Sequence, residues 1–170
     1  MTETEDELGA GGTAEIVPLE PATLTSTAVE LESIEVDAPR VGIIMGSKSD
    51  MDVMDGAASV LSDAGVLHEV RVMSAHREPD IVAQYCKNAR MRGLRVIIAG
   101  AGLSAALPGV AAAHTDLPVI GVPLSSRLSA MGGLDAILSV VQMPPGVPVA
   151  GVGLDNAKNA GHMALRILRS

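Results

Sequence analysis

His76 is the side chain best suited to proton chemistry, in the stretch Ser74-Ala75-His76-Arg77. This stretch follows a predicted strand and directly precedes a predicted helix. An imidazole can act as both acid and base near neutral pH. The arginine beside it offers a planar fork that suits phosphate. A histidine that merely caps the helix or lies exposed is the alternative interpretation.

The other three histidines are weaker candidates. His68 lies inside a predicted strand, His114 ends a predicted helix, and His162 lies on the final predicted helix. No two of the four histidines are spaced as metal ligands are and accompanied by a third possible ligand, so the sequence predicts no metal site.

Other predicted strands end in residues that suit a phosphate and a sugar. The stretch Gly46-Ser47-Lys48-Ser49-Asp50 precedes a helix, whose first amide hydrogens can bind an anion. Asp50 suits either a helix cap or ribose binding. The glycines of 100–102 would let backbone amides approach a planar ring. Ser125 and Ser126 follow a further strand, and no Walker loop or GxGxxG motif occurs.

Short apolar runs alternate with helical segments and must position these residues. The predicted strands are Val41–Met45, Leu67–Met73, Arg95–Ala99, Pro118–Val122 and Val147–Val152. The predicted helices are Asp50–Ala64, Glu78–Arg92, Ala105–Ala113, Gly133–Val141 and Asn156–Leu168. Right-handed crossovers make such a sheet parallel, and ligands bind beyond the carboxyl ends of its strands. The fold class is therefore α/β, a three-layer doubly wound parallel sheet. A flavodoxin-like strand order is preferred, although periodicity alone does not choose it.

The final predicted helix allows two interpretations. Its apolar side could pack against a neighbouring subunit or cover the sheet of its own chain, and the sequence does not decide between them.

Composition excludes several classes of function. Phe and Trp are absent, and Tyr85 is the only aromatic residue, so the core must be aliphatic. Residues 41–170 hold ten acidic and eleven basic residues, which is no basic footprint for nucleic acid. No apolar run is long enough for a membrane span. Cys86 is the single cysteine and is interpreted as a packing or helix-surface residue. A reducing, cytoplasmic location is expected.

Residues 1–40 differ from the rest of the chain. They carry ten acidic residues and one base, Arg40, within an overall net charge of -8. Low apolar density and high charge are typical of flexible segments. We therefore expect a flexible acidic extension at 1–40, solubilising or alternatively regulatory, and a catalytic domain at 41–170.

Several motifs occur in the order and spacing of a known family. They are Gly46-Ser47-Lys48-Ser49-Asp50, Ser74-Ala75-His76-Arg77, Ala99-Gly100-Ala101-Gly102, Leu107-Pro108-Gly109, Pro118-Val119-Ile120-Gly121-Val122-Pro123 and Gln142-Met143-Pro144. From about Val41 to Leu168 the chain resembles the PurE family, 5-(carboxyamino)imidazole ribonucleotide mutase. The resemblance implies a flavodoxin-like homo-octamer without metal or organic cofactor. Its substrate would be a small imidazole ribonucleotide.

The resemblance also implies a mechanism and a set of site residues. The substrate would lose carbon dioxide in the pocket and regain it at the ring carbon, with His76 shuttling the proton. Ser47, Asp50, Ser74 and Arg77 match positions that hold phosphate and ribose, and residues 100–107 match the loop around the ring. The full set of substrate-binding candidates is Gly46, Ser47, Ser49, Asp50, Ser74, Ala75, Arg77, Gly100, Ala101, Gly102, Ser104 and Leu107.

One loop departs from the family pattern. Where the usual bacterial sequence has Gly-Ala-Ala-His, this chain has Leu103-Ser104-Ala105-Ala106, so Ala106 replaces a histidine. The loop partly resembles the second class of the family, which carboxylates aminoimidazole ribonucleotide directly with carbon dioxide. Ser104 could restore a hydrogen bond to the carboxylate. The sequence around Arg77 and the stretch 142–146 favour the mutase class.

Three alternatives to the mutase therefore stay open. They are the direct carboxylase, a related carboxylase acting on a pyridine nucleotide, and a non-catalytic nucleotide-binding homologue.

Overall fold

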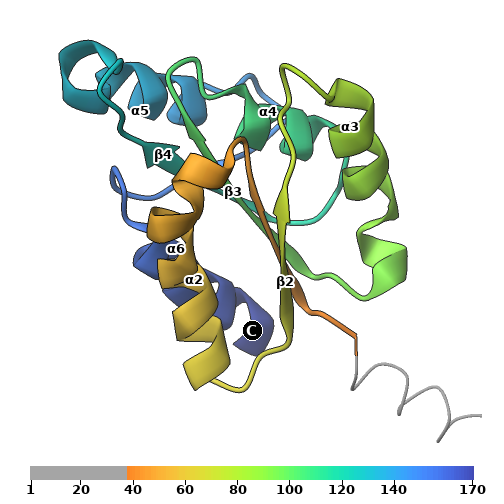
Figure 1. The fold of residues 1–170 in the computed structure, drawn as a ribbon. Coiled ribbons are helices and arrows are strands. Elements are labelled where there is room, and N and C mark those ends of the chain that lie inside the picture. The colour runs from red at the N-terminus through yellow and green to blue at the C-terminus, as the bar shows by residue number, and fades with distance from the viewer. Residues whose placement is uncertain (1–37) are drawn as a thin grey trace, which may run out of the picture. The chain divides into compact units, whose positions relative to one another are not determined.

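The computed structural model describes residues 38–170 and shows one five-stranded parallel sheet (Figure 1). Its strands are β1 (Val41–Met45), β2 (His68–Val72), β3 (Val96–Gly102), β4 (Val119–Leu124) and β5 (Ala150–Gly151). They lie in the order β2-β1-β3-β4-β5, and every neighbouring pair is parallel. This order confirms the predicted flavodoxin-like, doubly wound sheet.

Five α-helices and three short 3-10 helices join the strands in the described residues. The α-helices are α2 (Met51–Asp63), α3 (Pro79–Asn88), α4 (Ala106–Ala113), α5 (Leu134–Val141) and α6 (Ala157–Arg169). The 3-10 helices are η1 (Lys48–Asp50), η2 (Arg90–Arg92) and η3 (Ala130–Gly133).

The helices cover both faces of the sheet, which makes three layers (Figure 1). In β1, Ile43 packs with residues of α2 and α6, whereas Ile44 packs with residues of α3, α4 and α5. All five residues of β1 and all six of β4 are buried. Burial on both faces explains why these strands are continuous apolar runs rather than alternating ones.

Helix α6 covers the sheet of its own chain and packs against α2. Ala157, Ala160 and Ala164 are buried in the same core as Ala57 of α2. A Cβ on Gly161 would lie only 2.9 Å from Val60 Cβ and 3.0 Å from the Ala57 carbonyl oxygen. Small residues thus bring the two helices close together. Of the two interpretations of the final helix, the one in which its apolar side covers the sheet of its own chain is correct.

Strands β3 and β5 differ most from their predicted bounds, whereas β2 and β4 shift by at most two residues at either end. Strand β3 continues beyond its predicted end at Ala99 to Gly102, because its last residues pair with β4 as far as Leu124. A Cβ at Gly100 would collide with Met54 of α2. Glycine here permits a strand beneath a helix. Strand β5 is only Ala150–Gly151, not the predicted 147–152. Pro148 has no amide hydrogen to donate at this sheet edge.

Two predicted helices are interrupted at their ends. The segment predicted as 50–64 begins with η1 before α2, and the segment predicted as 78–92 breaks after Asn88 into η2. Gly65 and Gly93 follow in left-handed conformations, with φ of 69° and 91°. Glycines in this conformation commonly end helices.

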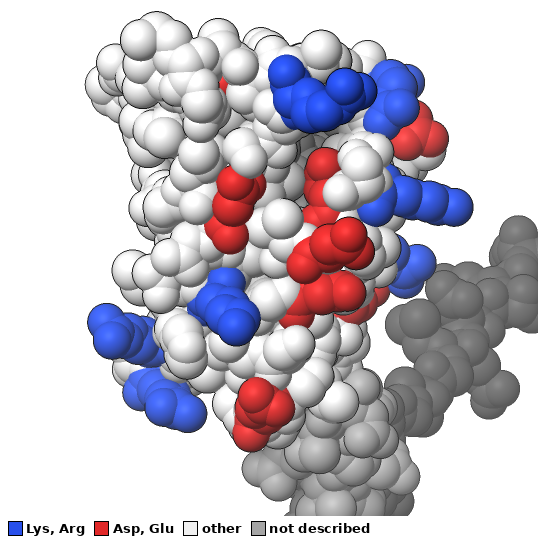
Figure 2. All heavy atoms as spheres, turned by 60° about the vertical axis from the view of Figure 1, so that its left-hand side comes forward, with Lys and Arg blue, Asp and Glu red and all other residues white. Residues whose placement is uncertain are grey.

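Most of the acidic extension lies outside the described residues, so its predicted flexibility and the boundary at residue 40 stay predictions. Arg40 precedes β1 and already joins the sheet: its amide donates to the Leu67 carbonyl, and its carbonyl accepts from the Arg95 amide. No helix in residues 38–170 is long and apolar enough to cross a membrane. Figure 2 shows a face on which acidic and basic side chains are interspersed.

Candidate active site

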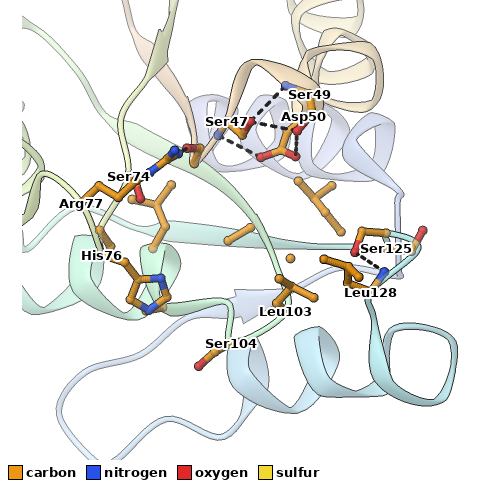
Figure 3. A pocket seen from close by; sticks show the side chains of 18 residues that line it. Ser47, Ser49, Asp50, Ser74, His76, Arg77, Leu103, Ser104, Ser125 and Leu128 are labelled. Carbon is orange, nitrogen blue, oxygen red and sulfur yellow. Dashed lines mark hydrogen bonds between the residues drawn. The ribbon is translucent and has the colours of Figure 1, made fainter.

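A cavity of about 440 Å³ lies at the carboxyl ends of the strands (Figure 3). Its volume is typical of a small-molecule site. The lining residues are Gly46, Ser47, Ser49, Asp50, Ser74, Ala75, His76, Arg77, Ala101, Gly102, Leu103, Ser104, Ala106, Leu107, Leu124, Ser125, Ser126 and Leu128. The structure therefore brings every predicted site residue except Gly100 around one cavity.

His76 lies in the turn between β2 and α3 and is exposed to the cavity. Its ring makes no hydrogen bond to another residue within 38–170, whereas His68 Nδ1 lies 3.0 Å from the Val66 carbonyl oxygen. Both nitrogens of His76 are therefore available to a bound molecule. A side chain that transfers a proton must be able to reach a bound molecule in this way.

Ser74 is the only polar side chain that is buried in the described part of the chain, at 8% exposure. Its carbonyl accepts the Glu78 amide, which shapes the turn, but its hydroxyl has no partner among residues 38–170. The oxygen itself reaches the cavity, because no fully buried side-chain oxygen or nitrogen in the described residues lacks a hydrogen-bond partner. A hydroxyl left without a partner at the wall of a cavity is suited to bind a ligand.

Arg77 connects the loops after β1 and β2. One Nη2–H group donates to the Gly46 carbonyl oxygen over 2.6 Å. This bond fixes the guanidinium at the cavity wall, and its remaining N–H groups have no partner among the described residues. The anchored fork can bind an anion with several donors at once.

Ser47, Ser49 and Asp50 form a hydrogen-bonded cluster on the opposite side of the cavity from His76 and Ser104 (Figure 3). The Ser49 hydroxyl donates to Ser47 Oγ at 2.9 Å and to Asp50 Oδ1 at 3.3 Å. The Ser47 amide donates to Asp50 Oδ2 at 3.1 Å, and the Ser49 amide donates to Ser47 Oγ at 3.2 Å.

Asp50 occupies the N-cap position of α2, but its side chain makes no capping hydrogen bond to that helix. Ser47 is the cap of η1, and the Asp50 carboxylate bonds back to it rather than to the first turn of α2. The reason is that a 3-10 turn precedes the α-helix, which shifts the capping box by one turn. The Asp50 carboxylate is thus held in place beside the cavity, where it can accept hydrogen bonds from sugar hydroxyls.

The glycines at the end of β3 serve packing more than ligand approach. A Cβ at Gly100 would meet Met54 and Leu124, and one at Gly102 would lie 2.8 Å from the Leu124 carbonyl oxygen. Gly100 therefore faces α2, outside the cavity lining. Ala101 and Gly102 reach the lining itself.

Some lining residues were absent from the predicted set. They are Leu103, Ala106, Leu124, Ser125, Ser126 and Leu128. Ser125 and Ser126 carried a signal, since they follow a strand end. Asp155 fixes Ser125 by accepting from its amide at 2.8 Å and from its hydroxyl at 2.5 Å. Leu128 lies in an irregular loop and had no signal in the sequence.

A charged cluster centred on Glu69 lies outside the cavity lining. Glu69 accepts hydrogen bonds from Tyr85 at 2.9 Å, from Arg92 at 2.6 Å and from Arg71 at 3.2 Å. Burial alone would raise the pKa of Glu69, but these three hydrogen bonds outweigh it and lower the pKa. The cluster joins β2 to α3 and η2, which makes its role structural.

Cys86 is buried, as the packing interpretation predicts. Burial raises the pKa of its thiol to about 11, so it is a poor nucleophile. Within residues 38–170 no group of three or more His, Cys, Asp or Glu side chains could hold a metal ion. Catalysis without a metal stays a prediction.

Known proteins resemble this chain over most of its length. Residues 40–170 match the family model of AIR carboxylase. The N5-carboxyaminoimidazole ribonucleotide mutase of Pyrococcus abyssi (strain GE5 / Orsay) is 58% identical over 135 residues, 79% of this chain and 76% of that protein. The protein of the same name from Thermotoga maritima is 57% identical over 130 residues, 76% of this chain and 75% of that protein.

A crystal structure of Treponema denticola PurE has a TM-score of 0.67 with this chain at 34% identity, and the match covers 77% of this chain and 80% of that one. These findings confirm the resemblance to the PurE family that the ordered motifs indicated. With the family model matched from residue 40 to the C-terminal residue, this chain belongs to the AIR carboxylase family.

Proposed function

We propose that the protein is a purine-biosynthesis mutase that converts 5-(carboxyamino)imidazole ribonucleotide to 4-carboxy-5-aminoimidazole ribonucleotide. Relatives more than half identical to the chain carry the name of this activity. The observation that carries the proposal is the shared cavity of His76, the unpartnered Ser74 hydroxyl and the anchored Arg77.

The polar side of the cavity suits the ribonucleotide part of the substrate. Arg77, Ser47 and Ser74 supply donors for the phosphate and the ribose, and the Asp50 carboxylate accepts from ribose hydroxyls. These assignments follow from donor and acceptor chemistry at the lining. Binding there would place the five-membered ring toward the apolar residues, which include Ala101, Ala106 and Leu107.

The reaction needs one bond broken, one bond formed and one proton moved. The nitrogen–carbon bond of the carboxyamino group breaks, which releases carbon dioxide and leaves an amine that gains a proton. The neighbouring ring carbon attacks the carbon dioxide, a carbon–carbon bond forms, and that ring carbon loses its proton. His76 carries the proton, because an imidazole can give and take one within a single cycle.

The direct carboxylase stays the alternative activity. It would form the same carbon–carbon bond from aminoimidazole ribonucleotide and free carbon dioxide. Ala106 lies in the cavity lining where the usual family sequence has a histidine, but the relatives cited above are named as mutases. Assays with the carboxyamino substrate at low bicarbonate, and with aminoimidazole ribonucleotide plus bicarbonate, distinguish the two activities.

The decisive variant is His76→Asn, which keeps a polar side chain but removes the proton carrier. Substrate binding should persist, and turnover should fall by about 100- to 10,000-fold, the usual effect of losing a general acid–base. The matched control is His162→Asn, an exposed histidine of α6 outside the cavity lining. Isothermal titration and a product assay measure the two effects. Equal turnover in His76→Asn and the parent would remove His76 from the mechanism.

We further propose that the subunits form a homo-octamer in the cytoplasm. Exposed apolar side chains on α5 support association between subunits. The cytoplasmic location stays a prediction from cysteine usage, and cell fractionation would test it.

A further inference from the structure

Leu103 has a backbone conformation that leucine rarely adopts. Its φ is 56°, in the left-handed region. Three residues other than glycine have positive φ in the described chain: Leu103, Met131 and Asp155. Only Leu103 among them lines the cavity. For a bulky residue such a conformation costs on the order of 1–3 kcal/mol, and strain of this kind concentrates at functional sites.

The surrounding chain holds this conformation in place. Gly102 is the last residue of β3 and pairs with Leu124 of β4, so the sheet fixes the start of the loop. On the other side, the Ala105 amide donates to the Leu103 carbonyl at 2.9 Å, and the Ala106 amide donates to the Ser104 carbonyl at 2.7 Å. The loop enters α4 directly afterwards, so Leu103 has little freedom to relax.

As a result, the Leu103 side chain stays uncovered in the cavity. It is 40% exposed, and Leu128, which lines the same cavity, is 79% exposed, whereas Leu107 and Leu124 are only 2% and 3% exposed. The labelled view places Leu103 and Leu128 at the end of the cavity away from Arg77 (Figure 3). Glycine or asparagine would satisfy the backbone without strain. Neither would present an apolar side chain there.

An apolar side chain at this place has a use in the proposed reaction. Carbon dioxide carries no charge, so neither Arg77 nor the serines can hold it strongly after it leaves the nitrogen. Its retention depends on shape and on the exclusion of water. Leu103 is a partly exposed apolar side chain within the predicted ring loop, residues 100–107.

We propose that Leu103 is a positioning residue that covers the ring end of the bound substrate and keeps the released carbon dioxide in the cavity. This inference rests on the proposed mutase activity. Leu103 then determines whether the carboxylate that leaves the nitrogen is the one that reaches the ring carbon.

The test measures the fate of a labelled carboxylate. Substrate with a ¹³C-labelled carboxyamino group is supplied to the full chain together with excess unlabelled bicarbonate and carbonic anhydrase, which equilibrates any escaped carbon dioxide. Two ratios are measured: label retained in the product, and free aminoimidazole ribonucleotide released per substrate consumed. A reaction without enzyme corrects for spontaneous decarboxylation.

Leu103→Asn keeps the left-handed backbone but makes the side chain polar, and Leu103→Gly removes the side chain together with the strain. Both should consume substrate, release a several-fold larger share as free aminoimidazole ribonucleotide, and lose label from the product. Leu103→Met, which stays apolar, should retain label like the parent. Circular dichroism verifies that each variant is folded.

Label retention that is unchanged in both Leu103→Asn and Leu103→Gly would overturn the inference, whatever happens to the overall rate. A lower rate with unchanged partitioning would assign Leu103 a purely structural role and would also overturn it. Failure of the parent to consume the substrate above background would instead refute the proposed function.

Discussion

At the scale of single residues, the contacts of Arg77 suit it to substrate binding rather than to proton transfer. Its bond to the Gly46 carbonyl crosses between two loops and fixes the direction of the guanidinium. A lysine would keep the charge but lose the planar fork, and could not hold the carbonyl and an anion in the same geometry.

We therefore expect Arg77→Lys to raise the KM for substrate, with a loss of about 1.5–3 kcal/mol in binding, as for hydrogen bonds to charged groups. The turnover number should change much less, because His76 is untouched. Steady-state kinetics measure the split. Arg71→Lys, at an exposed arginine outside the cavity lining, is the control. A fall confined to the turnover number would place Arg77 in the chemical step.

The sequence allowed most of these residues to be predicted, since strand ends of a parallel sheet meet at one edge. His76, Ser74 and Arg77 follow from that rule alone. The torsion of Leu103 does not, because nothing in the residue types predicts a leucine with positive φ. The Ser125–Asp155 contact was also out of reach, because it joins residues thirty positions apart.

At the scale of elements, the close contact of α2 with α6 depends on Gly161. A methyl group there would press against Val60 and the Ala57 backbone. At Gly56, on the partner helix, the nearest contact of a methyl group would be the flexible Lys158 side chain, 3.1 Å away.

The same substitution should therefore have opposite effects at the two positions. Gly161→Ala should destabilise the fold by about 1–3 kcal/mol through overpacking. Gly56→Ala should be neutral or stabilising, since alanine favours a helix by up to about 1 kcal/mol. Urea unfolding measures both free energies. Equal stability of the two variants would show that the helices can move apart freely.

The Glu69 cluster makes the β2–α3 edge sensitive to acid. Because the pKa of Glu69 is lowered in the folded protein, its ionised form contributes stability that is present above its ordinary value of 4.5 and is lost as the pH falls through the folded-state pKa. Glu69→Gln should be less stable than the parent at neutral pH, and the difference should shrink on acidification below 4.5.

Thermal unfolding over a pH series checks this expectation, with Glu78→Gln as the control, an exposed acid outside the cluster. A difference between Glu69→Gln and the parent that stays constant with pH would contradict it.

The order of elements was predictable from the alternation of apolar runs and helices, but some bounds were not. Gly100 lies beyond the predicted end of its strand, yet it is part of β3 because it pairs with Met45 of β1 and Val122 of β4. Residues 147–152 were predicted to form a strand, yet only Ala150 and Gly151 do so, since Pro148 has no amide hydrogen to donate. In both cases a tertiary contact or a missing donor outweighs the local pattern.

At the scale of the whole molecule, α5 presents an apolar stripe to solvent. Leu134, Leu138 and Val141 follow helical spacing and are 37%, 45% and 48% exposed, while Ala136 and Val140 face the core. Apolar stripes of this kind mark surfaces that associate. The stripe supports association between subunits, and the octamer itself stays a prediction from the family resemblance.

Light scattering coupled to size exclusion should give a mass of roughly 138 kDa, eight chains of 17.3 kDa. Leu138→Glu should reduce this mass by breaking an interface, whereas Leu67→Glu, at a residue of similar exposure outside α5, should not. A parent protein that elutes as a single chain would refute assembly.

The position of Tyr85 gives the protein a selective optical reporter. It is the only aromatic side chain in the chain, its hydroxyl bonds to Glu69, and Arg92 lies 5.2 Å from its ring centre. It does not line the cavity. The fluorescence of Tyr85 should therefore change when the sheet edge opens during unfolding and stay nearly constant when nucleotides bind. One sample can thus be used to distinguish unfolding from binding.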